Sequence, residues 1–222
     1  MDEQLRIGVV GGTGNEGRGL AVRFALTGVP VTIGSRDAAR AAEIACDLSA
    51  RHAGATIAGA SNEATIAGAN VVILAVPFVH AGGMLDTHRE AFTAGSLLID
   101  VTVPVIFEGG KPRFVEPAEG SAAEHLRLRL PDRVALACAF KTLPARLLEH
   151  VETALDCDDF VCGDSIESRD RVSALVRRIP GLRPVDAGAL DSARVLERMT
   201  LLAITINKRY KRHGARFQVL GI

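Results

Sequence analysis

The residues with the clearest chemical potential form the glycine-rich run GGTGNEG, at positions 11–17. The run follows the apolar stretch IGVV and opens a stretch with helical periodicity, which is the context that a phosphate-binding turn needs. In its G-x-G-x-x-G match, the first glycine permits a tight turn, the second lets the backbone approach a pyrophosphate, and the third lets helix and strand pack closely. The helix N-terminus then offers N–H groups to the anion. The predicted dinucleotide-binding residues are Gly12, Thr13, Gly14, Asn15, Glu16 and Gly17.

A second group of residues, Ser35, Arg36 and Arg40, follows the next apolar stretch and indicates which dinucleotide binds. A cofactor with a free ribose 2′-hydroxyl is usually held at this place by an acidic residue. Here Ser35 and Arg36 take that place, Arg40 lies one helical turn further on, and Asp37 is expected to start the next helix. Because an arginine fork pairs well with phosphate oxygens, these residues predict NADP rather than NAD.

A third group lies in ILAVPFVHA, residues 73–81. Val76 and Pro77 are expected at the edge of the sheet, where a dinucleotide crosses the point at which the strand order reverses. His80 is open to two interpretations: it contacts the cofactor, or it is an ordinary histidine in the first turn of a helix. Val76, Pro77 and His80 therefore complete the predicted cofactor edge.

The elements that must position these residues alternate between short apolar runs and alanine-rich helical stretches. Strands are predicted at 5–10, 30–34, 55–59, 70–76 and 96–101, and helices at 16–27, 37–52, 62–67 and 79–91. Continuous rather than alternating apolar strands indicate burial on both faces. The pattern predicts an α/β fold: a doubly wound parallel Rossmann sheet with helices on both faces.

The second half of the chain has a less regular pattern. The segment at 101–121 is rich in proline and glycine and is predicted to be a loop over one edge of the sheet. A helix, a strand, a short helix and a strand–helix–strand unit follow, and a long helix is expected at about 191–212. We predict an NADP-binding Rossmann domain at 1–130 and a small C-terminal α/β extension at 131–222, which carries the acceptor-binding region and packs on the first as one compact unit.

Composition restricts the possible partners. Lys and Arg number 26, as do Asp and Glu, so no basic field points to nucleic acid. The longest apolar run, at 71–79, is about half of what a membrane span needs, and no secretory signal is evident at the N-terminus. We therefore expect a cytoplasmic protein without nucleic-acid or membrane partners. The four cysteines show no paired spacing, so no metal site is predicted and burial in the core is expected.

Several further segments resemble one enzyme family. GGTGNEGRGLAVRFALTG, IGSRDAAR, AVPFVHA, EGSAAEHL, VCGD, GLRPVDAGAL and SARVLERMTLLAITINKRY occur in this order between Arg6 and Ile222. Together they resemble the NADPH-dependent coenzyme F420 reductases (F420H2:NADP+ oxidoreductases). The resemblance implies an oxidoreductase in which hydride passes directly between NADP(H) and the deazaflavin F420 while the two rings stack, with F420 as co-substrate. It also implies a homodimer.

The resemblance assigns roles to individual residues. Thr13, Ser35, Arg36 and Arg40 match NADP-binding positions. Leu143 matches the aliphatic residue behind the nicotinamide, and Arg194 and Thr200 match positions of the deazaflavin site. No certain catalytic residue follows from it: Lys141 and Leu143 are expected to line the hydride-transfer site.

Two residues depart from the family pattern. Lys141 stands where histidine is usual, and Arg198 stands where a small or neutral residue is more familiar. Arg194 and Arg198 share one helix face, where like charges repel. An anionic ligand could offset that repulsion, as could Asp191 and Glu197.

Alternatives stay open at this point. The protein could be an NADPH-dependent flavin reductase, or a small-metabolite dehydrogenase or imine reductase in which Lys141 handles a proton. It could also be an NADP-sensing binding protein without catalysis. The basic segment NKRYKRHGARF is a solvated helix end or contacts a coenzyme tail or a partner chain. The apolar face of the last helix is either core or a dimer seam.

Overall fold

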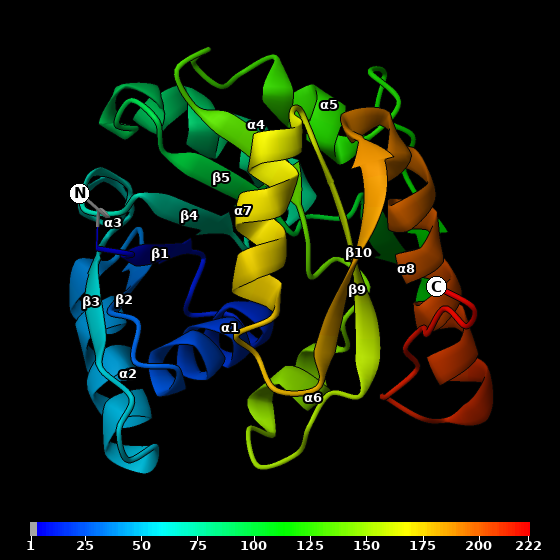
Figure 1. Ribbon diagram of the computed structural model, residues 1–222, viewed down its shortest axis with the longest axis horizontal. Helices are drawn as coiled ribbons and strands as arrows, with labels where there is room; N and C mark the ends of the chain where they lie inside the picture. Colours follow the sequence, from blue (N-terminus) through cyan, green and yellow to red (C-terminus); the bar gives the residue numbers. More distant parts are fainter. Residues whose placement is uncertain (1–3) are drawn as a thin grey trace.

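The computed structural model describes residues 4–222, and its centre is an eight-stranded sheet (Figure 1). The strands lie in the order β10-β9-β8-β5-β4-β1-β2-β3. Their bounds are β1 Ile7–Val10, β2 Val31–Ser35, β3 Ile57–Ser61, β4 Val71–Leu74, β5 Leu97–Asp100, β8 Ala135–Cys138, β9 Cys157–Gly163 and β10 Leu182–Ala189. Strands β1 to β5 and β8 are parallel, whereas β9 is antiparallel to β8 and parallel to β10. The parallel strands therefore all end at one edge of the sheet.

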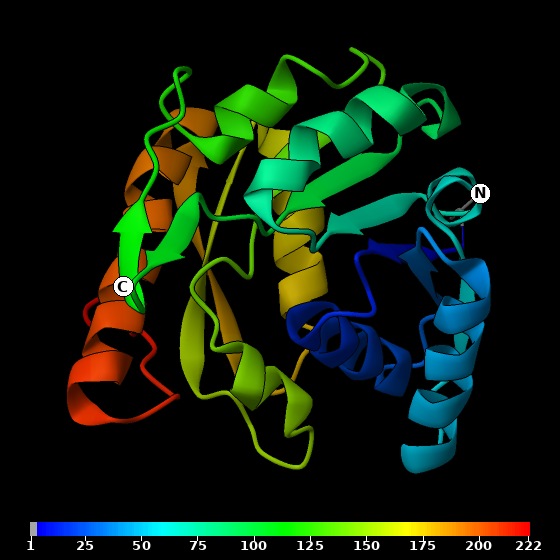
Figure 2. The same cartoon turned by 180° about the vertical axis from the view of Figure 1, so that it is seen from behind.

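Helices cover both faces of the sheet, as Figures 1 and 2 show. Their bounds are α1 Asn15–Leu26, α2 Ala38–Arg51, α3 Asn62–Ala67, α4 Phe78–His88, α5 Ala122–Arg127, α6 Ala145–Glu149, α7 Ile166–Val176 and α8 Ala193–Tyr210. One large apolar cluster joins α1, α2 and α7 to the sheet, and another joins α3, α4 and α5 to its opposite face. This double cover explains why β1, β4 and β5 are apolar at nearly every position. The predicted doubly wound fold is confirmed.

The predicted loop at 101–121 is wrong in its centre. A two-stranded antiparallel hairpin forms there from β6 Val105–Glu108 and β7 Lys111–Phe114. Gly109 and Gly110 connect the strands with φ values of 55° and 73°, a conformation that glycine adopts without steric cost. The flanking residues alternate only weakly in polarity, which hid the hairpin, although paired glycines between two short runs are a hairpin signal. In Figure 2 the hairpin lies beside α8.

The boundary predicted between 130 and 131 stays a prediction. Strand β5 pairs with β8 across it, from Leu97 opposite Ala135 to Asp100 opposite Cys138. The two parts therefore share one sheet. The predicted final helix is confirmed as α8, which a short 3-10 turn at Leu190–Ser192 precedes.

The cysteines are only partly as expected. Cys138, Cys157 and Cys162 are buried, but Cys46 is exposed on α2. Helix α2 is amphipathic. Ala45 lies on its buried face, and the next residue, Cys46, lies on its exposed face.

Candidate active site

The glycine-rich turn lies directly after β1, at the edge where the parallel strands end (Figure 2). Gly11 has φ 79°, the left-handed conformation that favours glycine. A Cβ at Gly12 would lie 2.6 Å from Ile33 Cβ, and one at Gly17 would lie 2.7 Å from Gly12 Cα. At Gly14 the nearest atom would be the Gly11 carbonyl oxygen at 3.5 Å. Two glycines thus permit close packing, while Gly14 leaves its surface free for a ligand.

Gly14 is also the N-cap of α1, and no side chain caps this helix. An uncapped helix start leaves backbone N–H groups available to an anion. The turn and the helix start therefore fit a dinucleotide pyrophosphate. Thr13 is half-buried and Asn15 is exposed at this place.

Ser35, Arg36 and Arg40 lie next to this turn because β2 pairs with β1 and ends at the same edge. The Ser35 hydroxyl accepts the Asp37 N–H at 3.1 Å, and the Asp37 carboxylate accepts the Arg40 N–H at 3.1 Å. Asp37 is therefore the N-cap of α2, as expected. The guanidinium groups of Arg36 and Arg40 are exposed, and neither bonds to any residue between 4 and 222. Both cations are available for a phosphate.

The third predicted group follows β4, on the other side of β1. A Cβ at Gly11 would lie 2.8 Å from Val76 Cγ1, so the two segments touch. Pro77 is the N-cap of α4. The His80 imidazole is exposed and has no hydrogen-bond or ion-pair partner among residues 4–222. The structure thus brings all three predicted cofactor segments to one edge.

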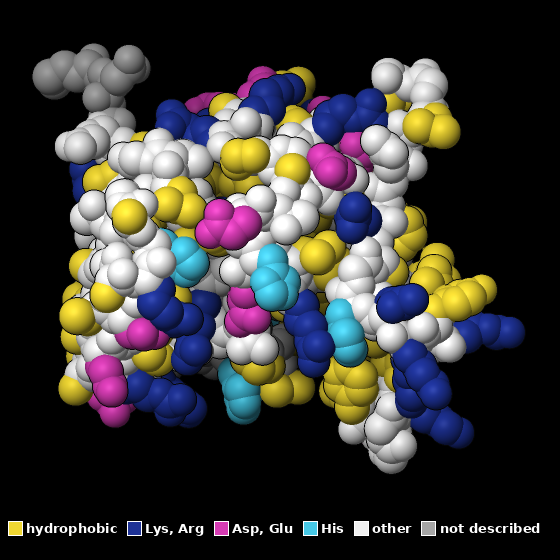
Figure 3. Space-filling model, turned by 90° about the horizontal axis from the view of Figure 1, so that it is seen from below, with side chains coloured by type: hydrophobic (Ala, Val, Ile, Leu, Met, Phe, Trp, Pro, Cys, Tyr) yellow, Lys and Arg dark blue, Asp and Glu magenta, His cyan; other side chains and the backbone are white. Residues whose placement is uncertain are grey.

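A cavity of about 630 Å³ opens beyond this edge, between the β6–β7 hairpin, the start of α6 and the C-terminal part of α8. Its apolar residues are Phe107, Leu143, Pro144, Ala145 and Ile204. Figure 3 views the molecule from this end and shows Lys and Arg side chains beside hydrophobic surface on the α8 side. The volume is that of a small-molecule site, and its apolar lining suits an aromatic ring system. The hydroxyls of Thr102 and Thr142, near Lys141, are buried and have no hydrogen-bond partner among residues 4–222.

Helix α1 fixes the segment that carries Leu143. The buried Arg23 guanidinium donates to the carbonyls of Leu148 at 2.9 Å and Leu147 at 2.7 Å, and also to two carbonyls in the following loop. Phe24 packs edge-on against Phe140, with ring centroids 5.9 Å apart. The helix that begins at the glycine-rich turn therefore also positions the wall of the cavity.

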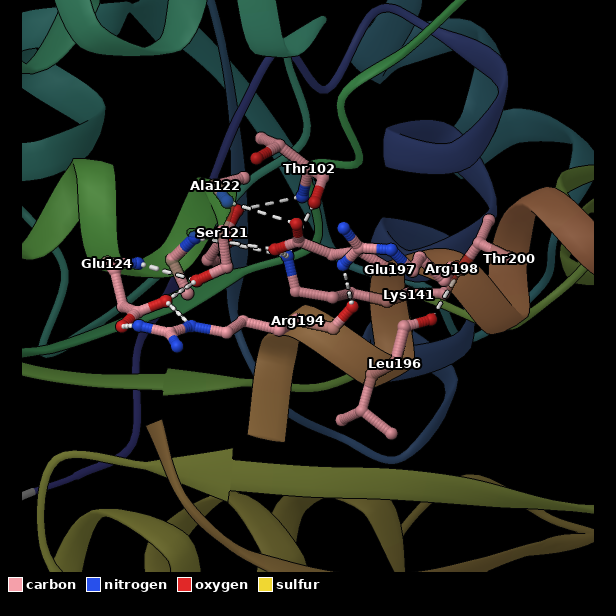
Figure 4. Close-up of polar contacts among 12 residues, drawn as sticks. Thr102, Ser121, Ala122, Glu124, Lys141, Arg194, Leu196, Glu197, Arg198 and Thr200 are labelled. Carbon is pink, nitrogen blue, oxygen red and sulfur yellow. Dashed lines mark hydrogen bonds and ion pairs between the residues drawn. The ribbon is translucent and has the colours of Figure 1, made fainter. Parts of the chain in front are cut away.

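Lys141 does not extend into the cavity. Its ammonium is buried and donates to Asp100 Oδ2 at 2.7 Å, to Glu197 Oε1 at 3.3 Å and to the Thr102 carbonyl. The Lys141 carbonyl accepts the Thr200 hydroxyl at 2.9 Å. Figure 4 shows these contacts between α8 and the ends of the strands. Burial alone would lower the pKa of Lys141, but the charges of Asp100 and Glu197 outweigh it and raise this pKa, so the ammonium stays charged.

Further carboxyl groups surround this lysine. Glu197 accepts the Ala122 N–H at 3.0 Å, and burial raises its pKa. Burial also raises the pKa of Glu16 to about 8, although Lys141 opposes this shift. Burial raises the pKa of Asp159 to about 8, against the effect of the Phe140 N–H at 2.8 Å. Burial therefore favours the protonated form of Glu16 and Asp159.

Arg194 and Arg198, in the first half of α8, each have an acidic partner that the sequence did not indicate. Arg194 donates to Glu124 through Nε at 2.8 Å (Figure 4). Arg198 donates to Glu116 at 2.6 Å. The Arg198 guanidinium also lies over the Phe114 ring, 4.7 Å from its centroid. Glu197 points to Lys141 instead. Of the two acidic residues on α8 considered above, Asp191 attracts Arg194, whereas Glu197 does not face either arginine. The ion pairs with Glu124 and Glu116 also offset the repulsion between Arg194 and Arg198. A ligand role for Arg194 stays a prediction.

Sequence reasoning missed four residues of this region: Gly11, Asp100, Asp159 and Glu197. Two of them had a readable signal. Asp100 ends the apolar run LLID, and a carboxylate at the end of a buried parallel strand points to a site. Glu197 lies on the face of α8 that also carries the buried residues Ala193 and Leu196. A glutamate on such a face requires a buried partner.

Comparisons with known proteins agree with this geometry. The family model of coenzyme F420-dependent NADP oxidoreductases matches residues 6–104. A relative from Methanothermobacter marburgensis, described as an F420-dependent NADP reductase, is 35% identical over 98% of this chain and 99% of its own. A relative with the same description from Methanocaldococcus jannaschii is 32% identical over 98% of this chain and 99% of its own. The chain belongs to the F420-dependent NADP oxidoreductase family.

This membership confirms the predicted oxidoreductase class and the predicted coenzymes, NADP(H) and F420. The crystal structure of a protein from Arthrobacter sp. FB24 has the same fold, with a TM-score of 0.82 and 24% identity over 98% of this chain and 100% of that chain. Among residues 4–222, no helix has the length and apolar character that crossing a membrane would require.

Proposed function

We propose that this protein transfers a hydride directly between NADP(H), bound at the glycine-rich edge, and F420, bound in the cavity beside Leu143. The observation that carries this proposal is the adjacency of two unlike sites. One is a helix start and a pair of arginines that no side chain of residues 4–222 caps or pairs with, and the other is an apolar cavity of about 630 Å³. When bound, NADPH supplies the hydride that the deazaflavin accepts.

The chain's own residues bind and orient in this proposal. Gly14 and the N-terminus of α1 hold the pyrophosphate, while Arg36 and Arg40 hold the 2′-phosphate. Leu143, which is 7% exposed, forms an apolar wall that excludes water. Direct transfer depends on alignment of the two coenzymes and needs no side chain that passes a proton to the reacting carbon.

The position of Lys141 favours this mechanism over the dehydrogenase or imine reductase alternative. An ammonium has three N–H donors, and Asp100, Glu197 and Thr102 accept from Lys141. It therefore has no free donor for a substrate. The flavin reductase alternative makes no demand on Lys141, so only the choice of acceptor tests it.

The deciding experiment mixes the purified protein with NADPH and oxidised F420 and follows the deazaflavin absorbance. Loss of that absorbance supports the proposal. Turnover with FMN or riboflavin but not with F420 would make the protein a flavin reductase. Tight NADPH binding without transfer to any of these acceptors would make it an NADP-sensing protein.

Cofactor choice is tested separately at Arg36 and Arg40. Replacing both with alanine should raise the KM for NADPH by at least tenfold, because two charge-assisted contacts to the 2′-phosphate are lost. The KM for NADH, which lacks this phosphate, should change little. An equal rise in the KM values for NADPH and NADH would refute the assignment of Arg36 and Arg40 to the 2′-phosphate.

A homodimer through α8 is a further part of the proposal. Val195, Leu202, Ile206 and Tyr210 lie at helical spacing, and Val195 and Leu202 are 63% and 51% exposed. An isologous contact between two copies would bury this face. Leu202→Glu should then give a monomer in light scattering, whereas Leu128→Glu, at an exposed leucine beside α5, should not. A wild-type monomer at micromolar concentration would refute the dimer. A cytoplasmic location stays a prediction.

A further inference from the structure

The cavity beside Leu143 has a one-sided charge. Five basic side chains line it: Arg146, Lys208, Lys211, Arg212 and His213. No Asp or Glu is among its lining residues. The whole chain has 26 Lys and Arg against 26 Asp and Glu, so this concentration of cations is local.

Most of these basic side chains have no partner among residues 4–222. The side chains of Arg146, Lys211, Arg212 and His213 are exposed, and none of them makes a hydrogen bond or an ion pair with residues 4–222. Lys208 donates to the Gly110 carbonyl of the hairpin turn. By contrast, Arg194 and Arg198, at the other end of α8, are each paired with a glutamate. Residues 4–222 therefore neutralise Arg194 and Arg198 at one end of this helix, whereas they provide no acidic partner for Lys211 and Arg212 at the other end.

Stabilisation of the helix dipole does not explain the whole set. Cations near the C-terminus of α8 complement its negative end. Arg146, however, belongs to α6, and it faces the same cavity as Arg212. Cations from two elements that are distant in the sequence thus surround one apolar floor, an arrangement that suits an anion attached to an apolar group.

We propose that this basic rim binds the acidic tail of the F420 coenzyme, its phosphate and glutamyl carboxylates, while the apolar floor receives the deazaflavin end. This inference rests on the proposed function and names the part of the coenzyme that the free cations recognise. Arg146 and Arg212 provide planar donor forks for phosphate or carboxylate, and Lys211 adds a point charge. The rim selects deazaflavins that carry an anionic tail over neutral ones.

The test compares F420 with 8-hydroxy-5-deazariboflavin, which has the same ring system but neither phosphate nor glutamates. In the Arg146→Gln/Arg212→Gln variant, kcat/KM for F420 should fall about tenfold relative to kcat/KM for the tail-less compound. The KM for NADPH should stay the same as in the wild type. Arg209→Gln is the matched control, because Arg209 is an exposed cation on α8 outside the cavity lining.

A binding measurement separates this inference from the proposed function. F420 fluorescence, titrated with protein in the absence of NADPH, gives a Kd without hydride transfer. For the wild type this Kd should rise steeply between 50 and 500 mM NaCl, and for the double variant it should rise less. The tail site would be overturned if the double variant kept the wild-type ratio of kcat/KM for F420 to kcat/KM for the tail-less compound. It would also be overturned if the Kd for F420 depended equally on salt in the wild type and the double variant. Neither result would contradict the reductase activity. Tight, salt-sensitive F420 binding without any turnover would instead refute the proposed function alone.

Discussion

Replacing Asp159 with asparagine should remove a defined part of the pH dependence of stability. Asp159 is buried in β9, and its carboxyl accepts the Phe140 N–H at 2.8 Å. Burial raises its pKa from 3.8 to about 8. Between roughly pH 5 and pH 7 the folded protein therefore holds one proton that the unfolded chain has lost.

The sign and size of the effect follow from this difference. A folded-state pKa above the unfolded value gives stability that is complete below the unfolded pKa and is lost as the pH rises through the folded pKa. Each pH unit lowers the free energy of unfolding by about 1.4 kcal/mol for one such group. From pH 5 to pH 7 the contribution of Asp159 is a loss of roughly 3 kcal/mol.

Asparagine keeps the acceptor for the Phe140 N–H but does not titrate. Asp159→Asn should therefore gain roughly 3 kcal/mol relative to the wild type when the pH rises from 5 to 7. The asparagine N–H groups could change the free energy of unfolding by a constant amount at every pH. This constant does not affect the test, because the test measures how the difference from the wild type changes between pH 5 and pH 7. Because the chain has no tryptophan, urea unfolding is best followed by far-UV circular dichroism.

The preceding residue provides a matched control. Asp158 lies on the opposite face of the same strand, where Arg183 pairs with it at 2.7 Å and lowers its pKa. Its contribution to stability is lost only as the pH falls below its unfolded pKa. Asp158→Asn should thus cost stability by the same amount at pH 5 and pH 7. Parallel pH curves for Asp159→Asn and the wild type would refute the buried, protonated carboxyl.

Three other substitutions test the positions of the turn and the cluster. Gly12→Ala should lower the free energy of unfolding in urea by about 1–3 kcal/mol, because its Cβ would meet Ile33 Cβ at 2.6 Å. Gly14→Ala should mainly weaken NADPH binding, measured by titration. Arg23→Met should cost about 2–5 kcal/mol, because carbonyls around α6 lose a buried donor. Lys141→Met should cost about 3–5 kcal/mol, since it leaves buried carboxylates unpaired; a loss below 1 kcal/mol would show that they are protonated without the lysine.

The cofactor edge could be predicted because its signals are local. Gly12, Gly14 and Gly17 are close in the sequence. Gly12 and Gly17 permit close packing, while Gly14 leaves its surface open to a ligand. Asp37 was recognised as a helix start for the same reason. Helices at 15–26 and 38–51 were predicted to within one residue at each end, because the glycine-rich turn precedes the first and Asp37 caps the second.

The acceptor side could not be predicted because its contacts join distant segments. The partners of Arg194 and Arg198 are 70 and 82 residues away in the sequence. Helical spacing on α8 shows that these arginines share a face, but it does not show which acidic residues from other elements meet them. Lys141 illustrates the same limit: the family resemblance implied that it lines the hydride-transfer site, whereas its side chain turns inward to Asp100.

The contacts of Lys141 explain how the two halves of the site are held in register. Its ammonium binds Glu197 and its carbonyl accepts the Thr200 hydroxyl, so both ends of this one residue hold α8 within a single turn. The same ammonium binds Asp100 at the end of β5, in the sheet that carries the glycine-rich turn. Lys141 is therefore one of the contacts that set the distance between the NADP edge and α8, beside the ion pairs of Arg194 and Arg198. Because hydride transfer is sensitive to sub-ångström alignment, a residue that never touches a coenzyme can still control the rate.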